Sequence, residues 1–160
     1  MQYLRSATLA LGLLSSIATS LSFAQSLDAR LQGCATCHGV DGNSALPNIP
    51  SLAGQPRVFL ENQMVVIREG LREIPAMKGQ LEGVNDATII AMAKFYASQN
   101  VKSSPAQKNQ VLYEKGQVIS KEALCGTCHL PNYVGRDQIP RIAGQREDYL
   151  LYSMRQFRSN

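Results

Sequence analysis

The sequence predicts an all-α protein built from two tandem modules. Apolar residues recur every three or four positions in several segments, which indicates amphipathic helices. No segment of useful length alternates apolar and polar residues, so little or no sheet is expected. Motifs found at residues 34–60 return at residues 125–150, and this predicts one structural unit written twice.

Three helices can be placed by their end signals. Pro56 stands at a favourable first helical position, and apolar residues continue at helical spacing until Gly70. Asn85 is a good N-cap for a second helix, whose apolar stripe is formed by Ile89, Met92, Ala93 and Tyr96. A third helix is expected over residues 109–120, just ahead of the second cysteine motif. Residues 39–55 are rich in Gly, Pro, Asn and Ser and predict a loop.

Two pairs of matching stretches define the repeat. CATCH at 34–38 returns as CGTCH at 125–129, and PSLAGQPRVFL at 50–60 returns as PRIAGQREDYL at 140–150. The offsets are 91 and 90 residues, so one residue of loop length accounts for the difference. The polar stretch NVKSSPAQKNQ is typical of a linker, placed at residues 101–110. The predicted domains are residues 25–100 and 111–160, called module one and module two below.

The first 24 residues have the three parts of a secretory signal peptide. Arg5 precedes an apolar run, and Ser22-Phe23-Ala24 favours cleavage after about Ala24. The apolar run is shorter than the ~20 residues of a spanning helix, so a cleaved signal is favoured over a membrane anchor. Export to the periplasm is therefore expected. The formal charge of +4 comes from scattered Lys and Arg, and no nucleic-acid binding is expected.

The two CxxCH motifs contain every cysteine and histidine of the chain. They are Cys34, Cys37 and His38 in module one, and Cys125, Cys128 and His129 in module two. The two CxxC pairs of a zinc site usually lie ~15 to 20 residues apart, whereas a linker separates these motifs. A thioredoxin-like dithiol belongs in a βαβ unit, and no strand precedes either motif.

Covalent haem c accounts for the motif as a whole. Two thiols three positions apart can form thioethers with one haem edge, and the next imidazole can reach the iron. The same chemistry uses all four thiols, which an exported protein would otherwise pair as disulfides. Two covalently attached haem c groups, each with its iron, are therefore predicted.

Module one offers three methionines as the second axial ligand of its iron. Met64 and Met92 fall on apolar faces of predicted helices, where methionine usually fills a core. Met77 lies in a loop, within IPAMKG, 39 residues after His38. Such a loop can reach the opposite face of the haem, so Met77 is favoured.

These residues resemble the class I c-type cytochromes, and specifically the tandem dihaem group called cytochrome c4. The resemblance rests on CATCHGVDGN, PSLAGQ, the PAM loop and the helix ending KFYASQ in module one, with CGTCH and PRIAGQ in module two. It implies two tandem class I cytochrome c domains, with Met77 as an axial ligand. It also implies that the carbonyls of Pro50 and Pro140 accept the ring protons of His38 and His129.

Module two departs from the family pattern at its end. The repeat offset of 90 places the counterpart of Met77 at position 167, beyond Asn160. The second domain is therefore expected to lack its C-terminal part, with the methionine loop and the closing helix. Met154 aligns with Met64 and is expected to pack rather than to bind iron.

The resemblance implies a one-electron carrier rather than an enzyme. Iron held by His and Met leaves no open position for a substrate and suits reversible electron transfer. The implied partners are respiratory redox proteins: a quinol-oxidising complex as donor and a terminal oxidase or reductase as acceptor, with peripheral association at membrane complexes. Two alternatives stay open: a haem-bearing subunit of an oxidase complex, and small-ligand or peroxide chemistry at an open second haem.

Overall fold

The computed structural model describes residues 18–102 and 109–159, with side chains placed from Leu27 onward in these ranges. Residues 1–17 of the predicted signal peptide, and residues 103–108 of the predicted linker, lie outside the described residues. The first helix, α1 (Ala18–His38), runs without a break past Ala24. Among the described helices, none is both long enough and apolar enough to cross a membrane.

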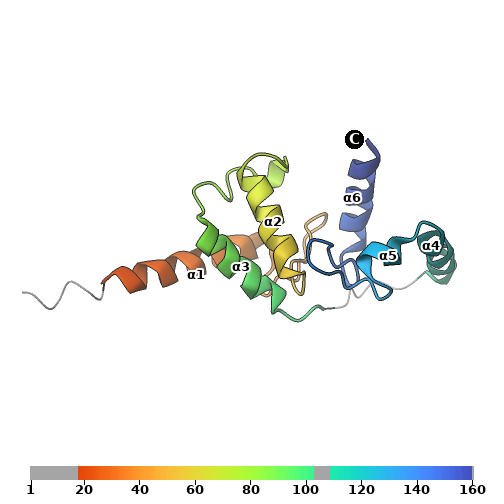
Figure 1. The fold of residues 1–160 in the computed structure, drawn as a ribbon, viewed down its shortest axis with the longest axis horizontal. Helices are drawn as coiled ribbons and strands as arrows, with labels where there is room; N and C mark the ends of the chain where they lie inside the picture. Colours follow the sequence, from red (N-terminus) through yellow and green to blue (C-terminus); the bar gives the residue numbers. More distant parts are fainter. Residues whose placement is uncertain (1–17, 103–108, 160) are drawn as a thin grey trace, which may run out of the picture.

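The described residues form helices and loops, with no strand among them. After α1 come α2 (Arg57–Arg68), the 3₁₀ turn η1 (Pro75–Met77), α3 (Asp86–Ala97), α4 (Gln110–Glu122), α5 (Cys125–His129) and α6 (Glu147–Ser159). The described residues contain one isolated antiparallel β-bridge, between Arg136 and Ile139. The all-α prediction is confirmed. Figure 1 shows α1 to α3 at one end of the molecule and α4 to α6 at the other.

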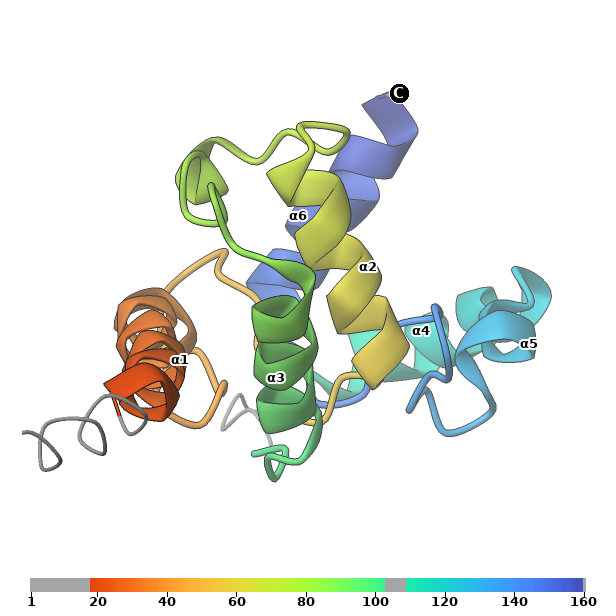
Figure 2. The ribbon, with the colours of Figure 1, turned by 60° about the vertical axis from the view of Figure 1, so that its left-hand side comes forward.

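In module one, α1 and α2 pack against α3. Figure 2 shows α3 between α1 and α2, and both neighbours contact it. The core has two clusters of buried residues: Leu81, Val84, Ile89 and Met92 in the first, and Leu60, Ala93 and Tyr96 in the second. Leu31 and Cys34 of α1 pack against both clusters. The predicted apolar stripe of α3 is therefore the face that meets the core.

Two asparagines cap helices: Asn85 at the predicted cap position, and Asn109 one residue before the first residue of its helix, which was predicted to start at 109. The Asn85 side chain accepts the backbone N–H of Thr88 at 2.8 Å, which satisfies a donor in the first turn of α3. Asn109 accepts the N–H of Leu112 at 3.1 Å in the same way. The helix after Asn109 continues to Glu122, slightly beyond its predicted end.

The predicted start of α2 is wrong by one residue. Pro56 is its N-cap, with an extended ψ of 132°, and the first helical residue is Arg57. The helix ends at Arg68, and Gly70 follows with φ of 69°, a left-handed conformation that glycine adopts without strain. Residues 39–55 form the expected loop.

Module two has a more open packing. No described side chain between residues 109 and 159 is fully buried. Large apolar side chains are exposed on α4, on α6 and at the turn before α5: Val111, Leu112, Val118, Ile119, Leu124, Leu151, Met154 and Phe157. An apolar surface of this kind is usually covered by another group, because its exposure to water is unfavourable.

Candidate functional site

The first cysteine motif forms the last turn of α1. Cys34, Cys37 and His38 stand three and four positions apart, so the helix presents them on one side. Cys34 is half-buried, Cys37 is exposed, and His38 is only 7% exposed. Both thiols are free, and burial raises the pKa of the Cys34 thiol.

A hydrogen bond fixes the ring of His38. Its Nδ1 lies 2.9 Å from the carbonyl oxygen of Pro50. Because a carbonyl oxygen only accepts, Nδ1 carries the proton and Nε2 keeps its lone pair. Burial lowers the pKa of His38, and the Pro50 hydrogen bond opposes this effect only in part. The lowered pKa keeps the ring neutral at neutral pH. The structure therefore presents a neutral imidazole with one nitrogen available to a metal.

The loop that carries Pro50 is closed by a tight turn. The backbone N–H groups of Leu52 and Ala53 both donate to the Gly42 carbonyl, at 2.7 and 3.0 Å. Gly42 has φ of 75°, and a Cβ added there would lie 2.7 Å from the ring of Tyr96. A side chain at this position would both strain the backbone and displace Tyr96.

The second motif repeats this arrangement on α5. Nδ1 of His129 lies 2.8 Å from the Pro140 carbonyl oxygen. The turn closes in the same way, since the Tyr133 carbonyl accepts two backbone N–H groups at 3.0 Å each. Tyr133 stands in the place of Gly42 and has φ of 57°. The motif's other members, Cys125 and Cys128, are free thiols, one half-buried and one exposed.

The three candidate methionines of module one all lie in or against a single core cluster. Met92 belongs to it and is only 1% exposed. Met64, on α2, and Met77, the last residue of η1, are half-buried and pack against the same cluster, as Cys34 does. In module two, Met154 is 63% exposed on α6, so the expectation that it packs is wrong.

The region around the first motif fits a haem. The Tyr96 hydroxyl is buried, and no described residue makes a hydrogen bond of ordinary geometry with it. Burial, and then the neighbouring Cys34 thiol, raises the pKa of this hydroxyl. The orphaned oxygen therefore lies close to the sulfur that would attach the group. Two thiols, a neutral imidazole and a thioether are the side chains that attach and ligate haem c.

The described residues do not form a site for a bare metal ion. No group of three or more His, Cys, Asp or Glu side chains among them is arranged to hold one. A zinc site built from both CxxC pairs would need such a cluster.

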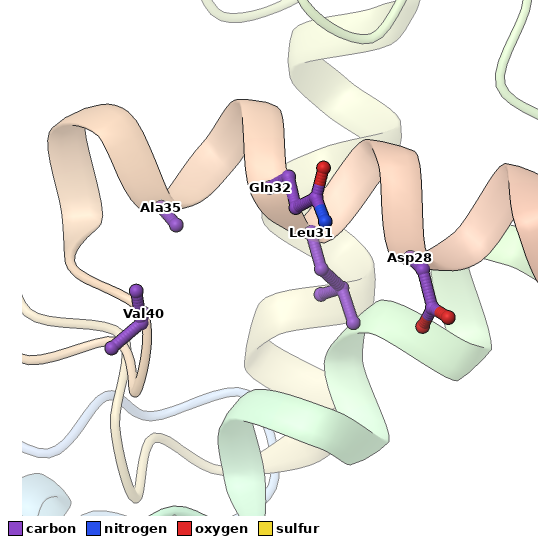
Figure 3. A pocket seen from close by; sticks show the side chains of 5 residues that line it. All are labelled: Asp28, Leu31, Gln32, Ala35 and Val40. Atoms are coloured by element: carbon purple, nitrogen blue, oxygen red, sulfur yellow. The ribbon is translucent and has the colours of Figure 1, made fainter.

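A depression of about 220 Å³ lies beside the first motif. Asp28, Leu31, Gln32 and Ala35 line it from α1, and Val40 lines it from the following loop (Figure 3). The Leu31 side chain points toward the α3 ribbon in this view, in agreement with its place in the core. The cysteines and the histidine of the motif do not line the depression, so it is a neighbouring surface feature.

Two groups near the motifs were missed in the sequence. The sequence predicts Tyr96 only as a member of an apolar stripe, and its buried hydroxyl has no signal in the hydrophobic pattern. Gln55 and Gln145 reach across to the other module. Their signal is that both copies of the repeat carry glutamine at this position.

Comparisons with known proteins place the chain among the cytochromes. The profile of the family described as "Cytochrome C oxidase, cbb3-type, subunit III" matches residues 29–95, which contain the first motif. Cytochrome c4 of Pseudomonas aeruginosa is 35% identical over 132 residues, which cover 78% of this chain and 66% of that protein. Cytochrome c4 of Azotobacter vinelandii is 33% identical over 141 residues, with 78% and 67% covered. The chain therefore spans about two thirds of the length of these relatives.

A solved structure shares the architecture. The crystal structure of reduced recombinant cytochrome c4 from Pseudomonas stutzeri matches with a TM-score of 0.75 and 30% sequence identity. The match covers 85% of this chain and 80% of that chain. A match of this extent is longer than either module alone, so the likeness includes parts of both.

Proposed function

The chain belongs to the cytochrome c4 family, and from this premise we propose that it is a periplasmic dihaem carrier of single electrons. It has the class I cytochrome c fold and covalently attached haem c with its iron. The observation that carries the proposal is the duplicated pairing of histidine and proline. Nδ1 of His38 and of His129 lies 2.9 and 2.8 Å from a proline carbonyl, and each Nε2 is left for iron.

The cysteines of each motif would attach one haem. Cys34 and Cys37 would hold haem one, the haem of module one, and Cys125 and Cys128 would hold haem two. When bound, each haem supplies a one-electron Fe(III)/Fe(II) couple. The protein supplies attachment, orientation of the axial imidazole and exclusion of water from the ligated face. His38 is only 7% exposed, which supports the exclusion of water from the ligated face in module one.

Met77 is the proposed second ligand of haem one. It is half-buried at the end of η1 and packs against the cluster that Cys34 also contacts, so the two ends of the haem site share one core. Met92 is enclosed within that cluster at 1% exposed and serves as filler. As a ligand, the Met77 thioether would stabilise Fe(II) and raise the reduction potential, which would suit a carrier placed before a terminal oxidase.

Pro50 and Pro140 are proposed to orient the two axial rings. A hydrogen bond to Nδ1–H fixes the tautomer and makes the imidazole a stronger donor to iron. The proposed electron donor is a quinol-oxidising complex, and the proposed acceptor is a terminal oxidase or reductase. The Fe(III)/Fe(II) couple of each haem would carry one electron at a time between the two. No observation on the described residues favours a permanently docked oxidase subunit or peroxide chemistry.

The experiment is haem attachment in a host that exports and matures c-type cytochromes. The wild-type chain should keep two haems through denaturing gel electrophoresis. The double variant Cys34→Ser with Cys37→Ser should keep one, and the matched variant Cys125→Ser with Cys128→Ser should keep the other. Haem that leaves freely on denaturation, or a wild-type chain without reversible Fe(III)/Fe(II) spectra, contradicts the proposal.

A further inference from the structure

The two modules are joined by a reciprocal pair of side-chain bridges. Ser51 donates its backbone N–H to Gln145 Oε1 at 2.8 Å, and Gln145 Nε2 donates to the Ser51 carbonyl at 2.9 Å. In the other direction, Arg141 donates its backbone N–H to Gln55 Oε1 at 2.9 Å, and Gln55 Nε2 donates to the Arg141 carbonyl at 2.8 Å. Each carboxamide therefore forms two hydrogen bonds with one residue of the opposite module: it accepts from the backbone N–H of that residue and donates to the carbonyl of the same residue.

The four residues are two equivalent pairs in the repeat. Ser51 and Arg141 are 90 residues apart, as are Gln55 and Gln145. The interface is therefore approximately symmetric, and the same two positions of each PxxAGQ motif meet across it. Figure 1 shows the modules meeting through the loops that precede α2 and α6, which carry these motifs.

In each module, the residue bound by the opposite carboxamide directly follows the proline whose carbonyl accepts the ring proton of the histidine. The carbonyl of Pro50 and the N–H of Ser51 belong to one planar peptide group. A continuous chain of hydrogen bonds thus runs from His38 Nδ1–H to the Pro50 carbonyl, and from the Ser51 N–H to Gln145 Oε1. In module two the chain runs from His129 through Pro140 and Arg141 to Gln55.

Hydrogen bonds in such a chain strengthen one another. A peptide group that donates through its N–H becomes polarised, and its carbonyl oxygen becomes a better acceptor. A stronger bond at the carbonyl gives the histidine more anionic character and makes it a stronger donor to iron. Fe(III) gains more from such a ligand than Fe(II), so the reduction potential falls. The effect is sheltered from water, because Gln55 is only 5% exposed and Gln145 is half-buried.

We propose that Gln55 and Gln145 are positioning residues that act in trans. Gln145 of module two tunes the axial histidine of haem one, and Gln55 of module one tunes that of haem two. This inference rests on the proposed function, since it assumes haems at both motifs. It goes further in stating that each haem reaches its working potential only when the opposite module is docked.

The test uses the full-length, haem-loaded protein with Gln145→Met and Gln55→Met, which keep side-chain length and remove both hydrogen bonds. Gln99→Met is the matched control, because the Gln99 carboxamide donates within its own module, to the Phe95 carbonyl at 3.0 Å. Redox titrations followed by NMR resolve the two haems. Hydrogen exchange at Nδ1–H of the two axial histidines is measured in the reduced protein.

Gln145→Met should raise the reduction potential of haem one and leave the potential of haem two unchanged. Gln55→Met should raise the potential of haem two and leave that of haem one unchanged. Exchange at the affected Nδ1–H should become faster, by less than the roughly fivefold change that corresponds to losing one whole hydrogen bond, because the bond to the proline carbonyl is weakened and not removed. Gln99→Met should change neither. If Gln145→Met impairs folding, Gln145→Glu, which keeps the acceptor oxygen, should leave exchange at His38 slow.

The inference is overturned if each variant shifts the haem of its own module, shifts both haems equally, or shifts neither. A purely structural contact predicts one of these results, because loosening the interface has no reason to select the distant haem. Failure of the proposed function is a separate result. It would be seen in the wild-type chain, as missing covalent haem, before any variant is compared.

Discussion

Replacing Met77 and Met92 separately distinguishes an iron ligand from a core residue. Both side chains belong to one cluster in module one, but Met92 is 1% exposed and Met77 is half-buried. Met92→Ala leaves a cavity beside Ile89 and Val84, and such a change costs about 2–5 kcal/mol of unfolding free energy. Met77 packs against the cluster from outside and is only partly buried, so Met77→Ala should cost less through packing, about 1 kcal/mol.

The reduction potential should respond in the opposite order. Met77→Ala removes the thioether that stabilises Fe(II), so the potential of haem one should fall and the reduced iron should bind carbon monoxide. Met92→Ala should lower stability without opening the iron. Urea unfolding followed by circular dichroism measures the first effect. Carbon monoxide difference spectra and redox titration measure the second, each compared with the wild-type chain so that any binding at haem two cancels.

Met64→Ala is the control for this pair, because Met64 is half-buried against the same cluster. If Met64→Ala or Met92→Ala admits carbon monoxide and Met77→Ala does not, the assignment of Met77 is wrong. If all three open the iron, the cluster as a whole holds the ligand in place, and the separation of ligand from filler fails.

Two further predictions concern caps and pH. Asn85→Ala should destabilise module one by about 1 kcal/mol in urea unfolding, because the first turn of α3 loses its side-chain acceptor; an unchanged midpoint would contradict this. Hydrogen bonding from Arg146, and then from the Asn48 N–H across the interface, lowers the pKa of Asp148 from 3.8 to about 2. Because the folded pKa is depressed, this contact stabilises docking above pH 3.8 and is lost as the pH falls through about 2. Exchange at the Asn48 amide should report the loss; Asp148→Asn should remove most of this pH dependence, and Asp41→Asn should leave it.

The features predicted correctly from the sequence are local ones. Asn85, the predicted cap, accepts a backbone N–H three residues later, and that distance along the chain is fixed by helix geometry. The error at Pro56 has the same scale, since a proline with φ near −60° is compatible with both the cap and the first helical position. Local signals therefore determine the existence of a helix and leave its end uncertain by one or two residues.

The contacts that were not predicted depend on tertiary structure. Tyr96 lies on the expected apolar face of α3, but only the approach of α1 brings its hydroxyl close to Cys34. Met154 shares the alignment position of Met64, yet it is exposed because the described part of module two places no core against it. Periodicity identifies which face of a helix is apolar, and it carries no information about what that face will meet.

The repeated PxxAGQ motif links the two levels, because one short sequence serves both the site and the interface. Its proline faces the histidine of its own module, and its glutamine grips the other module. Its glycine makes the approach possible: a Cβ at Gly54 or at Gly144 would lie 2.5 or 2.7 Å from the side chain of Val101, which packs between them. Since equivalent positions meet across the interface, a single motif, once duplicated, is sufficient to specify a symmetric contact. The repeat in the sequence thus encodes the docking of the modules as well as their number.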